Sequence, residues 1–154
     1  MVTKRAKAKP TITLVKKDKT LPKIKKIKVN KKKLLLSLKN ICSKLANQQA
    51  NGECEICHKA GSQAHHHFSK KAFPHLQFEL GNLLWLCFFC HIRRIHQQGQ
   101  YELARDALIV RLGSEGFQDL KKLAYKKYSG IKTKSIDSLV ELEKQLSALL
   151  QSQV

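Results

Sequence analysis

The segment from Glu53 to His96 reads ECEICHKAGSQAHHHFSKKAFPHLQFELGNLLWLCFFCHIRRIH. Two Cys-x-x-Cys pairs stand near its ends, at residues 54–57 and 87–90. Four thiolates at this spacing can close a tetrahedral zinc site, and a hydrophilic chain gains folding free energy from the metal. A site with four sulfur ligands has no open position for chemistry. We therefore predict one structural zinc ion, held by Cys54, Cys57, Cys87 and Cys90.

The alternative for these cysteines is simple burial or pairing in disulfides. Two pairs at metal-ligand spacing are more typical of a reducing compartment than of a secreted disulfide framework. The fifth cysteine, Cys42, is expected to be a structural thiol on a helix face.

A second pattern lies between and just after the cysteine pairs. Three histidines occupy residues 65–67, an asparagine follows at position 82, and His91 comes directly after the last cysteine. If residues 64–68 form a strand, the first and third histidines face one side and the second faces the other, so the three cannot share one role. A neutral imidazole is a good metal ligand and can act as a general base near pH 7. This combination indicates metal-assisted hydrolysis of a phosphodiester, which needs an activated water and a cation.

These residues resemble the HNH endonuclease family, in particular its small phage and bacterial members with a four-cysteine zinc knuckle, over residues 54–96. The resemblance rests on the paired histidines before Phe68, on Asn82-Leu83-Leu84-Trp85-Leu86-Cys87, and on His91. It implies an α+β fold: a ββα-metal finger with the zinc knuckle, flanked by helices. It also implies metal-dependent hydrolysis of DNA to a 5′-phosphate and a 3′-hydroxyl, with RNA left open as a substrate.

The resemblance also implies a role for each residue of this pattern. His66 is the general base, and Asn82 hydrogen-bonds and orients it. His65 and His91 are ligands of a catalytic divalent ion such as Mg²⁺ or Mn²⁺. Many relatives have Asp at the position of His65, and a shift by one residue would instead make His66 the ligand and His67 the base. Both registers stay open at this point.

Other side chains of the module have less definite roles. His96 follows His91 by five residues, whereas an α-helical turn favours a spacing of four, so it is either a third ligand or a phosphate contact. Trp85 and Phe88 are expected in the core, and His58 at the surface, as is His75. The predicted contacts to nucleic acid are Lys70, Lys71, Arg93, Arg94, Lys25 and Lys26.

The charge of the chain is strongly positive and unevenly spread. There are 30 Lys and Arg against 11 Asp and Glu, which gives a formal net charge of +19. Half of the positive residues fall within the first 40 positions, where Asp18 is the only acid. Residues 1–30 are therefore predicted to be a flexible basic arm that lies along phosphates. No run approaches the roughly 20 apolar residues that span a bilayer, so we expect a cytoplasmic, nucleic-acid-associated protein with no membrane contact.

Helices are predicted on both sides of the module at residues 51–98. Apolar residues recur at three and four between positions 31 and 50, and Asn51-Gly52 ends that helix. The C-terminal region, residues 99–154, shows helical spacing up to Gly113, a second short helix before Gly130, and a last helix from Ser135. That last helix has a leucine stripe, which packs on its own domain or forms a homodimer.

Two further functions compete with a DNA endonuclease. The first is a zinc-stabilised nucleic-acid-binding module without turnover, although the complete His, Asn, His set argues against it. The second is a branched-DNA resolvase in phage recombination, which a basic arm and a dimer would suit.

Overall fold

The computed structural model describes residues 30–126 and 135–152. The predicted arm, with Lys25 and Lys26, and the predicted helix end at Gly130 lie outside the described residues. The fold class is α+β, as predicted, with one small antiparallel sheet. In chain order the elements are α1 (Lys31–Gln49), β1 (Gln63–His66), η1 (Pro74–Leu76), η2 (Leu80–Asn82), β2 (Leu83–Leu86), η3 (Phe89–Gln97), α2 (Tyr101–Tyr125) and α3 (Ile136–Ser152).

Helix α1 occupies the range in which the sequence predicts a helix. Its N-cap is Asn30, whose side chain accepts hydrogen bonds from the backbone N–H groups of Lys32 and Lys33. The chain leaves the helix through Asn51 and Gly52, both with positive φ. Its buried face consists of Leu34, Leu38, Cys42, Leu45 and Ala46.

The two strands form a hairpin-like pair whose register sets the direction of each histidine. β1 and β2 are antiparallel, with His65 opposite Leu84 and His66 opposite Leu83. Because side chains alternate along a strand, His65 and His66 leave the sheet on opposite faces.

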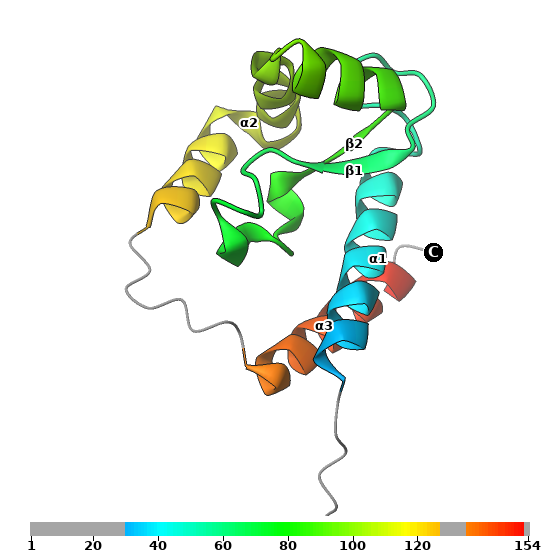
Figure 1. Cartoon of the computed structure of the whole chain (residues 1–154), viewed down its shortest axis with the longest axis vertical. Coiled ribbons are helices and arrows are strands. Elements are labelled where there is room, and N and C mark those ends of the chain that lie inside the picture. Colours follow the sequence, from blue (N-terminus) through cyan, green and yellow to red (C-terminus); the bar gives the residue numbers. More distant parts are fainter. Residues whose placement is uncertain (1–29, 127–134, 153–154) are drawn as a thin grey trace, which may run out of the picture.

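Each face of this sheet is covered by a different pair of helices (Figure 1). On one face, Leu84 and Leu86 pack with side chains of η3 and α2. On the other, Leu83 and Trp85 pack with α1 and α3. Trp85 is thus a core residue, as predicted. Phe88, by contrast, is 57% exposed, so the prediction that it belongs to the core is wrong.

The C-terminal helices follow the predicted pattern. Gly113 interrupts α2 with φ 73° and ψ 167°, and this kink separates the two predicted helices. Ser135 caps α3 by accepting a hydrogen bond from the Ser138 N–H. Leu139 and Leu146 of the stripe are buried against α1 of the same chain, and a homodimer through α3 stays a prediction. Among the described helices, none is long and apolar enough to cross a membrane.

Candidate metal centres and active site

The four predicted zinc ligands lie together. The sulfur atoms of Cys54, Cys57, Cys87 and Cys90 are all within 4.8 Å of one another, and none is in a disulfide. A tetrahedron of sulfurs at the usual Zn–S distance has edges of about 3.8 Å. The Sγ atoms of Cys57 and Cys87 are 3.7 Å apart, which is close to that edge. The four-cysteine cluster therefore fits a zinc ion.

The four thiols do not ionise independently of one another. Burial raises the pKa of Cys57. At Cys87 burial also raises the pKa, but the Cys90 N–H and the neighbouring thiols outweigh it and bring the pKa down to about 7. Packed thiols resist ionising together because like charges repel, whereas a bound metal deprotonates them outright.

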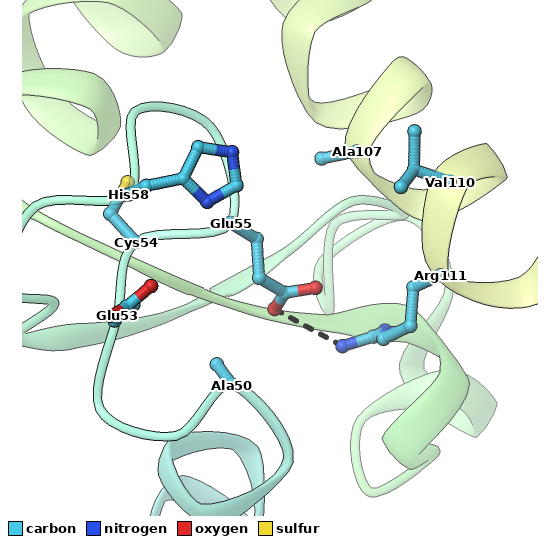
Figure 2. A pocket seen from close by; sticks show the side chains of 8 residues that line it. All are labelled: Ala50, Glu53, Cys54, Glu55, His58, Ala107, Val110 and Arg111. Atoms are coloured by element: carbon cyan, nitrogen blue, oxygen red, sulfur yellow. Dashed lines mark hydrogen bonds and ion pairs between the residues drawn. The ribbon is translucent and has the colours of Figure 1, made fainter.

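A partly buried ion pair joins the four-cysteine cluster to the rest of the fold. Glu55 lies between Cys54 and Cys57 in the sequence and accepts a hydrogen bond from Arg111 of α2 at 3.1 Å (Figure 2). It also accepts one from the Trp85 N–H at 2.7 Å. Arg111 also donates to the carbonyl oxygens of Gly81 and Leu83. Burial raises the pKa of Glu55, and this effect outweighs the Trp85 N–H and the Arg111 charge, which both lower it. Because each charge lies in a partly buried position and is paired with the other, removing one partner would leave a costly unpaired charge.

A second cluster consists of three histidines. One ring nitrogen from each of His65, His91 and His96 lies within 4.8 Å of the other two. The ring centroids are 5.0 Å apart for His65–His91, 5.4 Å for His65–His96 and 4.9 Å for His91–His96. His65 is only 5% exposed, and burial, with repulsion from His91 and His96, lowers its pKa to about 3. Neutral imidazoles this close together can hold a divalent ion.

The local geometry of η3 explains why His96 joins this cluster. In an α-helix, residues five apart point about 140° away from each other. However, η3 is a π-helix, in which the N–H of one residue bonds the carbonyl five residues before it. The Gln98 N–H, for example, donates to the Arg93 oxygen at 3.0 Å. This wider coil brings His91 and His96 to the same side, so the expected spacing of four does not apply.

Gln63 is a site residue that the sequence reasoning missed. Its Oε1 accepts a hydrogen bond from Nδ1 of His91 at 2.6 Å. This bond fixes the proton on Nδ1 and leaves the Nε2 lone pair of His91 for a metal. The available signal was strand parity: Gln63 stands two residues before His65 and so faces the same side of β1.

His66 lies on the opposite face of β1, toward α1. Its Nε2 is 3.0 Å from the Gln77 carbonyl oxygen. A carbonyl oxygen only accepts, so Nε2 bears the proton and Nδ1 keeps a free lone pair. Burial lowers the pKa of His66, and the charges of Lys70 and Lys39 lower it further against the effect of the Gln77 bond. His66 is therefore neutral near pH 7.

Asn82 is fully buried, but its side chain does not bond His66. The prediction that Asn82 orients His66 is therefore wrong. Oδ1 of Asn82 accepts from the Phe68 N–H at 2.8 Å, and its Nδ2 donates to the carbonyl oxygens of Phe68 and Leu76. The Asn82 side chain thus holds the loop that follows β1, while the Gln77 backbone holds His66. A buried amide is satisfied by the nearest backbone groups, and here these belong to the loop.

The remaining predicted site residues are spread around these clusters. The ring of His67 lies against Phe68 and Phe117 and is not part of the three-histidine cluster. Lys70 and Lys71 are exposed. On η3, the Arg93 side chain bonds Gln97, and Arg94 bonds Gln100. His58 is exposed, but His75 is half-buried and bonds the Leu123 oxygen.

Comparison of the chain with protein-family models, with curated proteins and with solved structures finds no match.

Proposed function

We propose that this protein is a metal-dependent endonuclease of the HNH type that hydrolyses DNA phosphodiester bonds. The observation that carries the proposal is the convergence of His65, His91 and His96 between a two-stranded antiparallel sheet and the helix that follows it. We interpret β1, β2 and η3 as a ββα-metal finger that the four-cysteine cluster stabilises as a zinc knuckle. This interpretation accounts for the order of the elements and for both clusters.

The three-histidine cluster would hold the catalytic divalent ion. When bound, that ion supplies positive charge for the phosphate oxygens as negative charge develops on them. Three imidazole ligands leave coordination positions open for water and substrate, which four thiolates do not. An all-nitrogen donor set suits transition metals such as Zn²⁺ or Ni²⁺ better than Mg²⁺, which prefers oxygen ligands. We therefore expect a transition metal to support activity better than Mg²⁺.

His66 would act as the general base. Its Nδ1 lone pair is free because Nε2 donates to Gln77, and burial keeps the ring neutral. In the proposed reaction, Nδ1 takes a proton from the attacking water as the water oxygen bonds to phosphorus. The bond from phosphorus to the 3′ oxygen breaks, and that oxygen takes a proton from solvent water to become the 3′-hydroxyl. The register with His65 as ligand and His66 as base is favoured, because His65 is the member of the histidine run that meets His91 and His96.

At the edge of β1, one phosphodiester could contact both His66 and the metal held by His65. Within the described residues β1 pairs with β2 alone, so its second edge has no strand beside it. His65 and His66 leave this narrow sheet on opposite faces at adjacent positions. A phosphodiester that lies along the free edge would meet His66 from one face and the metal held by His65 from the other.

The test is cleavage of supercoiled plasmid by the purified protein with Zn²⁺, Ni²⁺, Mn²⁺, Mg²⁺ or no added divalent metal. We expect nicked or linear product with a transition metal, and no product from His65→Ala, which should keep its structural zinc. Single-stranded DNA, RNA and four-way junctions, run in parallel, distinguish the substrate class. If the wild-type protein binds DNA and cuts none of these substrates under any condition, the endonuclease proposal is wrong and the non-catalytic binding module replaces it.

A further inference from the structure

A cavity between α1 and the sheet lies beside His66 and includes residues of α1 that the predicted site does not contain. Lys39 and Ser43 line it from α1, His66 from β1, and Lys70 from the loop after β1. No carboxylate is among its lining residues. The cavity is therefore a concave surface with two cations and a hydroxyl group.

We propose that Lys39, Ser43 and Lys70 form a subsite for a backbone phosphate of the nucleic acid, next to the phosphate that His66 serves. This inference rests on the proposed function, because it places the substrate strand next to His66. It assigns α1, which lies outside the zinc and histidine module in the sequence, as one wall of the substrate groove.

The two lysines are available for an anion. Among the described residues the ion pairs are Arg105–Asp106, Arg111–Glu55 and Lys122–Asp119, and neither Lys39 nor Lys70 takes part in one. Both lysines line the same cavity as His66. Two unneutralised cations on either side of one cavity repel each other, and a phosphate between them removes that repulsion.

The cavity also offers directional hydrogen bonds. Lys39 and Ser43 are four residues apart on α1, so they lie one above the other on the same face of the helix. The ammonium groups and the hydroxyl can donate to different oxygens of one phosphate. Lys70 is two residues from Phe68, the loop residue that the Asn82 side chain holds, so this hydrogen-bonded loop positions the second cation.

The experiment compares the full-length protein with Lys39→Gln, Lys70→Gln and the double variant. The matched control is Lys44→Gln, an exposed lysine of the same helix that does not line the cavity. Binding to a short labelled duplex is measured by fluorescence anisotropy over a range of salt, without added divalent metal, so that cleavage is not required. Zinc content and thermal unfolding check that each variant is folded.

We expect each cavity variant to weaken binding and to reduce the slope of log affinity against log salt by about one, because one phosphate contact is lost. Lys44→Gln should bind with the wild-type slope. The inference is overturned if Lys39→Gln and Lys70→Gln keep that slope. It is also overturned if inorganic phosphate binds the cavity in calorimetry while the duplex does not depend on the lysines, which would indicate a site for a free anion.

The result is separable from the proposed function. If wild-type protein never cleaves but the lysine variants change the salt slope, the subsite stands and the nuclease proposal fails. If the protein cleaves and the slopes are unchanged, the nuclease proposal stands and the subsite fails.

Discussion

The four-cysteine and three-histidine clusters lie in the same module but have opposite designs. The cysteines supply four ligands, so a metal there is closed off, and the Glu55–Arg111 pair ties their loop to α2. The histidines supply three ligands, and Gln63 orients His91 from within β1. A closed site can contribute only folding free energy, whereas an open site can bind substrate. On the proposed function, ligand number and supporting contacts would therefore distinguish a structural site from a reactive one.

The largest effect is expected from the four-cysteine cluster. Cys87→Ser should lose the zinc and the cooperative unfolding transition, because a structural zinc contributes about 10 kcal/mol or more, comparable to the whole stability of a domain. Metal analysis after dialysis and thermal unfolding by circular dichroism measure this. Cys42→Ala, at a buried thiol outside the cluster, should keep its zinc. If Cys87→Ser kept both zinc and stability, the contrast between the two clusters would disappear.

The next largest effect is expected on the cleavage rate when His66, the proposed general base, is replaced. His66→Ala should lower the cleavage rate by about 10²- to 10⁴-fold while zinc content and DNA affinity stay at wild-type levels, because a general base acts on the attacking water. His67→Ala is the matched variant in the same histidine run and should cleave at close to the wild-type rate. If His67→Ala were inactive and His66→Ala active, the alternative register would be correct.

A smaller effect is expected at Gln63, which orients His91 in the three-histidine cluster. Gln63→Ala should lower the affinity for the catalytic metal by about 10- to 100-fold, because His91 loses the hydrogen bond that fixes its tautomer. Metal titration of cleavage should shift to higher concentration, and saturating metal should restore the rate. Gln97→Ala removes an exposed glutamine of η3 that bonds only Arg93 and serves as control. An unchanged titration curve for Gln63→Ala would mean that His91 is oriented by other contacts.

The smallest effect is expected on the free energy of unfolding when Gly61 is replaced. Gly61 lies between the zinc knuckle and β1, and a Cβ there would clash with the Trp85 indole. Gly61→Ala should therefore lower the free energy of unfolding by about 1–3 kcal/mol through overpacking, with zinc retained. Gly81→Ala, whose Cβ would meet only ordinary contacts, is the control. Equal stability of the two variants in chemical denaturation would contradict this account of the Gly61 position.

The sequence alone was sufficient for features that depend on short-range patterns. The spacing within each Cys-x-x-Cys pair identified all four members of the cluster, since a turn of four residues brings two sulfurs to one ion. The spacing of apolar residues predicted α1, and Ser135 predicted the start of α3. Strand parity separated His65 from His66. Each of these follows from the geometry of a single helix, strand or turn.

The tertiary structure decided which of these elements meet and which partner each polar group finds. The π-helical coil of η3 brings His96 to His91, although their spacing does not suit an α-helix. Asn82 bonds the loop at Phe68 rather than His66, and Lys39 joins the His66 cavity from another element. The physical reason is that a buried polar group bonds whatever packing places beside it. That neighbour comes from a distant part of the chain, which local periodicity does not encode.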